Sequence, residues 1–191
     1  MSSQPDRQSW ISPEEYLALE RKAERKSQYL NGEILAMAGA SREHNLIVGN
    51  LVREIGNQLR GGPCEVYPSD MRVRVRETGL YTYPDVSVVC GAPEIEDAHG
   101  DTLLNPTLLI EVLSSSTGND DRGWKSEHYR RIPSLQEYLL VPQDEPRVQR
   151  YRRRGEREWV ITEVVGLGES VELASVGCEL GLVEEIGRAH V

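Results

Sequence analysis

Apolar residues recur along this chain with two different spacings. From 43 to 59 they follow helical spacing, at positions 46, 48, 51, 52, 55 and 59, which predicts an amphipathic helix. Ser12 before Pro13 and two acids has the pattern of a helix N-terminus, and predicts a first helix to about residue 25. Asn31-Gly32 between two apolar runs predicts a tight β-hairpin over 28–37.

The remaining apolar runs are short, rich in β-branched residues and bounded by Gly or Pro, which is typical of strands. A helix is predicted over 121–131, ended by Pro133. The chain therefore predicts a mixed α+β fold of the α/β type. Strands are expected at 64–76, 80–90, 107–113, 137–141, 147–152, 159–165 and 170–173.

Two of these runs each contain an acid. Asp85 lies in the run 83–89, and Glu111 lies in the run 108–113. A buried carboxylate loses hydration worth several kcal/mol unless a cation or hydrogen-bond donors replace the water. Two acids in neighbouring buried strands therefore indicate a site for an oxygen-preferring ion such as Mg²⁺. The alternative is structural, since Asp85 could cap a turn and Glu111 could pair with an arginine.

A lysine in the predicted helix completes this set. Lys125 is one helical turn from both Asp121 and Tyr129, which places the three on one face. If Tyr129 packs on the sheet, Lys125 points the same way and could orient a nucleophile or stabilise developing negative charge. The alternative is a lysine on a solvated helix face.

Composition limits the domain organisation and the compartment. With 191 residues, one domain is expected over 12–185, after a flexible 1–11. The terminal residues 186–191 resemble a translated sequencing adapter and are taken as a non-native tail, so His190 is left out of the site. The three cysteines predict free buried thiols in a reducing compartment. Because no apolar stretch approaches the roughly 18 residues of a membrane span, a cytoplasmic protein without membrane contact is expected.

Charge bears on nucleic-acid binding in two ways. The net charge of −9 argues against binding by bulk electrostatics and leaves room for a local basic face. Arg72, Arg74 and Arg76 alternate with valines, so one strand face would carry three guanidiniums able to contact phosphates. A second arginine-rich segment, 147–157, predicts either a DNA-backbone patch or a surface hairpin balanced by its own acids.

The stretches Tyr83–Val86 and Ile110–Thr117, followed by Asp121, Gly123, Lys125 and Tyr129, resemble the Uma-type branch of the PD-(D/E)XK nuclease superfamily. The resemblance implies a restriction-endonuclease-like core, a mixed central sheet flanked by helices with extra β-hairpins. It implies Mg²⁺ as cofactor, with Mn²⁺ as a substitute. It also implies that Glu33 and His44 lie near the cleft as second-rank site residues. The alternative for Glu33 is a surface acid of the hairpin, and that for His44 is a polar residue at a helix N-terminus. In the wider superfamily the lysine stands two residues after the second acid, where this chain has Leu113; in the Uma-type branch Lys125 takes its place.

These observations predict a metal-dependent endonuclease that hydrolyses DNA phosphodiester bonds. Asp85 and Glu111 would hold the metal, and Lys125 would serve the transition state. The first alternative is a catalytically silent module that binds DNA or protein with the same fold. The second is a hydrolase of small phosphoesters. DNA is the expected partner, and a homodimer is expected by analogy with other nucleases of this fold.

Overall fold

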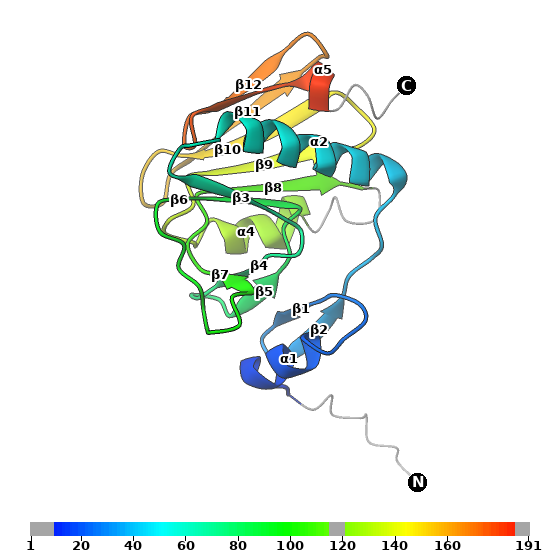
Figure 1. Cartoon of the computed structure of the whole chain (residues 1–191), viewed down its shortest axis with the longest axis vertical. Helices are drawn as coiled ribbons and strands as arrows, with labels where there is room; N and C mark the ends of the chain where they lie inside the picture. Colours follow the sequence, from blue (N-terminus) through cyan, green and yellow to red (C-terminus); the bar gives the residue numbers. More distant parts are fainter. Residues whose placement is uncertain (1–9, 115–120, 186–191) are drawn as a thin grey trace.

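A six-stranded sheet forms the centre of the molecule (Figure 1). The computed structural model describes residues 10–114 and 121–185. Neighbouring strands are antiparallel except β8 (Leu108–Leu113) and β9 (Glu137–Pro142), which are parallel and are joined through a helical crossover. The strand order is β11 (Trp159–Val165), β10 (Arg147–Arg153), β9 (Glu137–Pro142), β8 (Leu108–Leu113), β6 (Val86–Cys90) and β3 (Cys64–Pro68).

A second, five-stranded sheet lies below the first in Figure 1. The predicted hairpin forms its outer part, and its turn residues Asn31 and Gly32 have φ of 50° and 90°, the positive values that a type I′ turn requires. The hairpin prediction is thus confirmed. The strand order is β2 (Glu33–Ala36), β1 (Ser27–Leu30), β5 (Leu80–Thr82), β4 (Arg72–Val75) and β7 (Thr102–Leu103).

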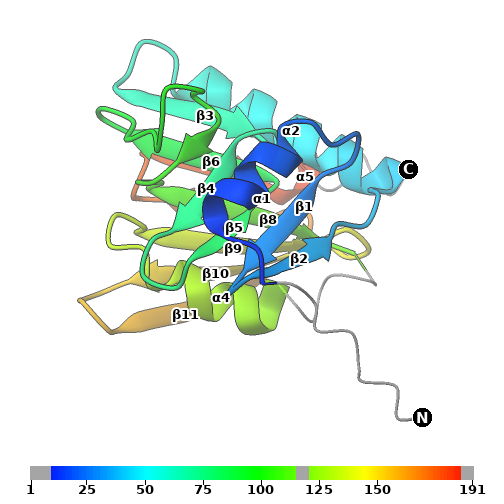
Figure 2. The same ribbon diagram turned by 90° about the horizontal axis from the view of Figure 1, so that it is seen from below.

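Helices cover both faces of the six-stranded sheet. Helix α2 (Arg42–Gln58), close to its predicted range, packs on one face together with the hairpin of β12 (Ser170–Leu173) and β13 (Cys178–Gly181) and the short α5 (Leu182–Glu185). The helical turn η1 (Asp121–Lys125) continues into α4 (Ser126–Tyr129) on the other face. Helix α1 (Pro13–Glu20) packs on the smaller sheet and lies in front of it when the molecule is seen from below (Figure 2).

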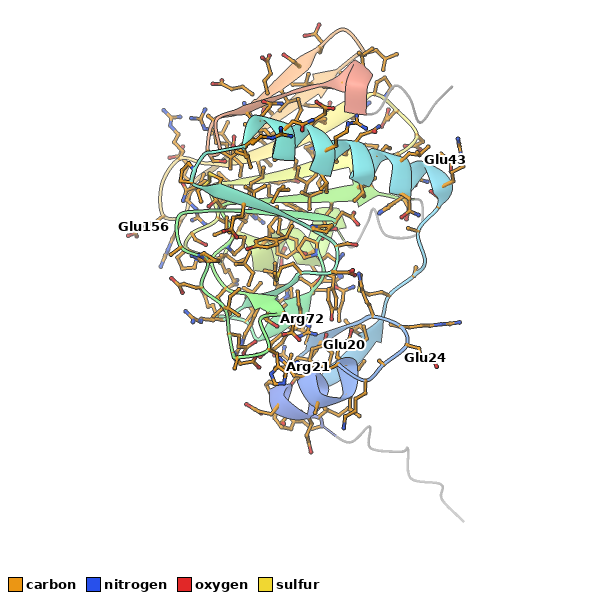
Figure 3. The ribbon with its side chains drawn as sticks, viewed as in Figure 1. Glu20, Arg21, Glu24, Glu43, Arg72 and Glu156 are labelled. Carbon is orange, nitrogen blue, oxygen red and sulfur yellow. A yellow bond between two sulfur atoms is a disulfide. The ribbon has the colours of Figure 1, made fainter. Side chains whose placement is uncertain are left out.

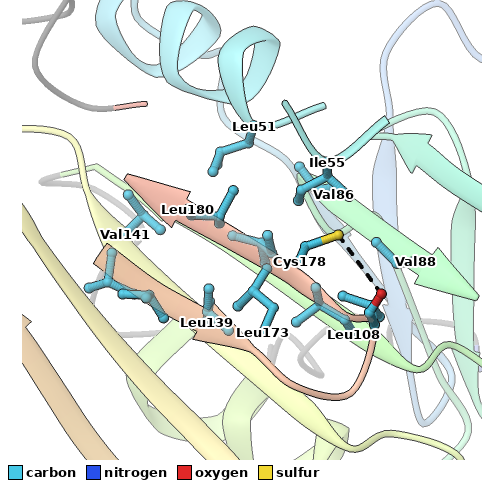
Figure 4. Close-up of a cluster of buried hydrophobic side chains, with 14 of the residues drawn as sticks. Leu51, Ile55, Val86, Val88, Leu108, Leu139, Val141, Leu173, Cys178 and Leu180 are labelled. Atoms are coloured by element: carbon cyan, nitrogen blue, oxygen red, sulfur yellow. Dashed lines mark hydrogen bonds between the residues drawn. The ribbon is translucent and has the colours of Figure 1, made fainter. Parts of the chain in front are cut away.

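Strand β8 shows how the core is divided. Leu108, Ile110 and Val112 face α2, and Figure 4 shows this side, where Leu51 and Ile55 of the helix meet the sheet. Leu109 and Leu113 point the other way, into the core that includes residues of α4. Because successive side chains of a strand alternate between faces, Glu111 takes the α4 side with the two leucines. Each fully buried aliphatic side chain stabilises the fold by about 1.5–3 kcal/mol.

Two predicted strands are each divided in the structure. The range 64–76 forms β3 and β4, and the range 80–90 forms β5 and β6, so each crosses from one sheet to the other. The chain turns after Pro68, where the amide of Met71 donates to the Pro68 carbonyl, and passes through Tyr83-Pro84 in the second case. Proline has no amide hydrogen for a strand ladder, which explains the position of both breaks.

Ionic contacts fasten α1 to the smaller sheet. Glu20 accepts a hydrogen bond from the hydroxyl of Tyr83, and Arg21 pairs with Asp97 and Asp101 at 2.8 Å. Figure 3 shows Glu20 and Arg21 near Arg72, which pairs with the same Asp101. At its start α1 has the predicted serine cap: the Ser12 side chain accepts from the Glu15 amide, and the Glu15 carboxylate accepts from the Ser12 amide. The helix ends at Glu20 instead of near residue 25.

The prediction of three free thiols is wrong for two of them. Cys64 and Cys90 stand opposite each other on the antiparallel strands β3 and β6 and form a disulfide. The strand register brings them together across 26 residues, and a spacing of that length carries no signal in the sequence. Cys178 is a buried free thiol, as expected.

Candidate active site

A cavity of about 680 Å³ opens between the two sheets and the start of α2. Its wall includes all three residues of the main prediction, Asp85, Glu111 and Lys125, together with His44. The smaller sheet and the segment after β2 form the opposite wall. These four residues, which are up to 81 positions apart in the chain, therefore line the same cavity.

Asp85 stands directly before β6, at the end of the strand nearest the cavity. Its Oδ2 accepts a 2.7 Å hydrogen bond from the amide of Val112, and its Oδ1 lies 2.9 Å from Nε2 of His44. The side chain is 15% exposed. A backbone donor on one oxygen and an imidazole at the other fix the direction of the carboxylate towards strand β8.

Glu111 is almost completely buried, with 3% of its surface exposed. The hydroxyl of Tyr129 donates to its Oε1 at 2.7 Å, and the Lys125 ammonium lies 3.5 Å from the same oxygen. Burial and the nearby Glu111 charge raise the pKa of Tyr129 well above its usual value, so this hydroxyl remains a donor. The cost of burying the acid is therefore offset by a cation and a charge-assisted hydrogen bond.

The two acids belong to neighbouring strands, Glu111 within β8 and Asp85 directly before β6. Val86 of β6 pairs with Ile110 of β8, and one step further along this antiparallel register Asp85 comes opposite Glu111. Residues directly opposite in an antiparallel pair have Cβ atoms about 4.5–5.5 Å apart and point to the same face. The hydrogen bond from Val112 to Asp85 agrees with this register. The two acids therefore come from the same end of neighbouring strands, beside the cavity that both of them line.

This donor set fits a magnesium ion. Mg²⁺ prefers carboxylate oxygens, usually takes one or two of them from the protein, and keeps its other positions for water and phosphate. Among the described residues, no three His, Cys, Asp or Glu side chains form a ready-made ligand group. Asp85 and Glu111 would therefore be the protein ligands, with space for water and substrate in the cavity.

Of the two second-rank residues, His44 lines the cavity and Glu33 does not. His44 enters the site through its contact with Asp85, and the cap of α2 holds it there, because the Ser41 side chain accepts from the His44 amide and also bonds to Gln143 after β9. Glu33 is exposed beside the hairpin turn and does not line the cavity. The opposite end of that hairpin, at Gln28 and Ala36, reaches the cavity instead.

The three alternating arginines have acidic or hydroxyl partners within the protein. Arg72 is 3% exposed and donates to the hydroxyls of Tyr83 and Thr102. Arg74 pairs with Glu96, and Arg76 pairs with Glu94. The side chains of this strand face thus bind neighbouring loops, and Arg72 is inaccessible to a phosphate.

Arginines of the segment 147–157 also have acidic partners within the protein. It builds β10 and the turn to β11, at the edge of the six-stranded sheet and outside the cavity wall. Arg147 pairs with Glu145 and Glu163, and Arg154 pairs with Glu158. These ion pairs agree with the interpretation of the segment as a surface hairpin balanced by acids.

Sequence reasoning missed two cations of the site. Arg25 and Lys26 line the cavity from the side of the smaller sheet. The first helix was predicted to continue to about residue 25, whereas it ends at Glu20. No motif distinguishes these two cations from others on the surface. Residues 115–117 of the serine-rich run after β8, residues 1–9 and the tail 186–191 lie outside the described residues, as does the side chain of Asp121.

No helix of the described chain is both long and apolar enough to cross a membrane.

A mixed sheet with a helical crossover between its parallel strands, and two opposed acids at the cavity, defines a protein with a nuclease-like α+β fold. The chain belongs to the Uma2 family, described as "Putative restriction endonuclease", whose model matches residues 13–182. This confirms the resemblance noted in the sequence.

The relatives and a solved structure agree with this assignment. Two Synechocystis proteins, both named as uncharacterized, are similar: sll1609 is 39% identical over 86% of this chain and 93% of its own, and slr1290 is 38% identical over 87% and 86%. A crystal structure from Anabaena variabilis, named as a "putative nuclease belonging to DUF820", has a TM-score of 0.77 and 20% identity, covering 94% of this chain and 99% of that one. At that identity the likeness establishes the fold.

Proposed function

We propose that this protein is a Mg²⁺-dependent endonuclease that hydrolyses phosphodiester bonds of DNA. The observation that carries the proposal is the pair of opposed carboxylates, Asp85 and Glu111, with the Lys125 ammonium 3.5 Å from Glu111. The family description and the name of the structural neighbour point to a nuclease in general terms. The metal, the DNA substrate and the residue roles are the proposed part.

The residues divide the work by their chemistry. Asp85 and Glu111 would hold the ion, which when bound supplies Lewis-acid polarisation of the phosphate and a water of lowered pKa. The ammonium of Lys125 would stabilise the negative charge that develops on the phosphoryl oxygens. Tyr129 and His44 would act as positioning residues, because each contacts an acid and fixes its orientation.

The position of Lys125 supports activity in spite of the departure from the wider superfamily pattern. Leu113, which stands where that pattern has a lysine, is 4% exposed and packs in the core with Tyr129. Lys125 reaches the same acid from the crossover between β8 and β9. One cation therefore still accompanies the second acid, and it comes from a different element.

Magnesium titration of plasmid cleavage tests the proposal. The wild type is expected to nick or linearise supercoiled plasmid at millimolar Mg²⁺, and Asp85→Asn and Glu111→Gln are expected to lose this activity. Asp144→Asn is the matched control, since Asp144 is exposed and outside the cavity wall. No cleavage with Mg²⁺ or Mn²⁺ would refute a DNA endonuclease, and cleavage of a chromogenic phosphodiester without plasmid cleavage would favour the small-phosphoester hydrolase.

Thermal unfolding measures metal binding, which distinguishes a metal-dependent enzyme from the catalytically silent module. A ligand that binds the folded state raises the melting temperature by mass action. Mg²⁺ should therefore stabilise the wild type and Asp144→Asn, but much less either acid variant. A wild type whose melting is unchanged by both metals would favour a module that binds without catalysis.

A further inference from the structure

The wall of the cavity facing the acids carries its own positive charge. Arg25 and Lys26 lie between α1 and β1 and line the cavity, on the side of the smaller sheet. We propose that they form a phosphate subsite that holds the substrate backbone next to the bond that is cut. This inference rests on the proposed function and adds to it the residues that position the strand.

Lys26 has capacity for such a ligand. Its ammonium donates to the carbonyl of Ser69 at 2.8 Å and lies 2.5 Å from Asp70, which uses two of its three N–H bonds. The Asp70 carboxylate is 87% exposed, so the pair is screened by water and is weak. The third N–H bond remains for a phosphate oxygen.

Arg25 is the more accessible of the two cations. Its side chain is exposed and makes no hydrogen bond or ion pair with any residue that the structure describes. A guanidinium presents its donors in a planar fork that matches two oxygens of one phosphate. Arg25 and Lys26 together therefore offer an anion two charges and several free donors.

The charge distribution of the cavity favours a role for Arg25 and Lys26 in holding an anion. The third cation of the wall, Lys125, is buried against Glu111, and the chain as a whole is acidic at −9. Lys125 and the proposed ion offset the charges of Asp85 and Glu111, so neither is left to attract the rest of the substrate backbone. Arg25 and Lys26 place compensating charge on the opposite wall, where it attracts the backbone and leaves the acids to the metal.

The contacts of Lys26 place the subsite in the same cavity as the acids. The Lys26 ammonium lies 5.2 Å from the centre of the Tyr83 ring. Tyr83 precedes Asp85 by two residues in the chain, and both line the cavity together with Lys26. A phosphate held by Lys26 would therefore belong to the same stretch of substrate that enters the cavity.

Oligonucleotide binding by a catalytically silenced protein tests the subsite independently of cleavage. The background is Asp85→Asn, and the probe is a fluorescent 20-nucleotide single strand or duplex followed by anisotropy across a range of salt concentrations. Arg25→Gln is expected to weaken binding by about 10-fold and to lower the slope of log affinity against log salt by about one, because one phosphate contact is lost. Arg25→Lys should restore most of the slope.

Lys22→Gln is the matched control, because Lys22 is exposed three residues away and outside the cavity wall. It should leave the slope unchanged. Lys26→Gln should act like Arg25→Gln, and its melting temperature should be measured because Lys26 also holds the 69–70 turn. In the active background, Arg25→Gln should raise KM for plasmid and change kcat little.

The outcomes separate the two proposals. If the wild type cleaves and Arg25→Gln matches Lys22→Gln in slope and KM, the subsite is refuted while the nuclease stands. If the wild type does not cleave and Arg25→Gln still lowers the slope, the subsite is supported and the nuclease falls. Absence of oligonucleotide binding by the parent protein refutes the subsite.

Discussion

Replacement of Lys125 by methionine tests the site most directly, because the change removes the ammonium and keeps an apolar stem of similar length. At 3.5 Å, the attraction to Glu111 is about 5 kcal/mol for an effective dielectric constant of 20. Part of this is offset because the variant no longer buries a lysine charge, and the Tyr129 hydroxyl still bonds to the acid. The expected net loss of folding free energy is about 2–4 kcal/mol without metal.

Two measurements follow from this magnitude. In a protein of this size, such a loss lowers the melting temperature by roughly 5–15 °C. Saturating Mg²⁺ should raise the melting temperatures of the variant and the wild type by similar amounts, because stabilisation by a ligand depends on its affinity. Plasmid cleavage at saturating Mg²⁺ should fall by about 10²–10³-fold, the effect of losing one electrostatic donor to the transition state, while Mg²⁺ affinity changes little.

Lys22→Met is the control for the loss of one lysine charge at an exposed site and should melt and cleave like the wild type. Cleavage by Lys125→Met at the wild-type rate would show that another group performs the electrostatic role. A variant that loses Mg²⁺ affinity together with cleavage would show that the lysine organises the metal site, contrary to the proposed division of roles.

Three further outcomes are expected. Tyr129→Phe removes the 2.7 Å hydrogen bond to the second acid and should lower Mg²⁺ affinity or cleavage about 10–100-fold, as measured by metal titration; an unchanged titration contradicts a positioning role. Gly32→Ala should lower the melting temperature by roughly 2–8 °C, since φ is +90° and the added Cβ would stand 2.1 Å from the Trp10 ring; an unaltered melt contradicts the turn geometry. The bond to Arg21 lowers the pKa of Asp101 from 3.8 to about 2, so its stabilisation is present above pH 4 and is lost as pH falls towards 2; acid unfolding of Arg21→Gln should lack this component.

The elements with a strong local signal were predicted from the sequence. The hairpin at Asn31-Gly32, the serine cap of α1 and the amphipathic α2 each depend on residues close together in the chain. The distribution of strands between two sheets was missed, because a continuous β pattern does not record that Pro68 and Pro84 mark passages from one sheet to the other. Long-range pairing decides such breaks.

The candidate site also combines residues that the sequence predicted with residues that it did not. Asp85 and Glu111 were predictable because an acid within an apolar run is expensive to bury, and Lys125 because its helical spacing matched that of Tyr129. Arg25 and Lys26 were not predictable as site residues, because exposed cations are common. Only the fold brings these two to the cavity that also contains the acids. The disulfide was also hidden, because it depends on the register of β3 and β6.

Glu111 and Lys125 of the candidate site are held by elements of different kinds. Glu111 lies within β8, and ladder partners on β6 and β9 hold the backbone around it on both sides, from Val86↔Ile110 to Leu113↔Pro142. Lys125 is carried by a short helical segment that ends the link from β8 and continues into α4. A displacement of that segment would change the distance from the ammonium to the acid without changing the strand register that positions the carboxylates. In the proposed enzyme, the alignment of the lysine would therefore depend on a different element from the one that positions the metal ligands.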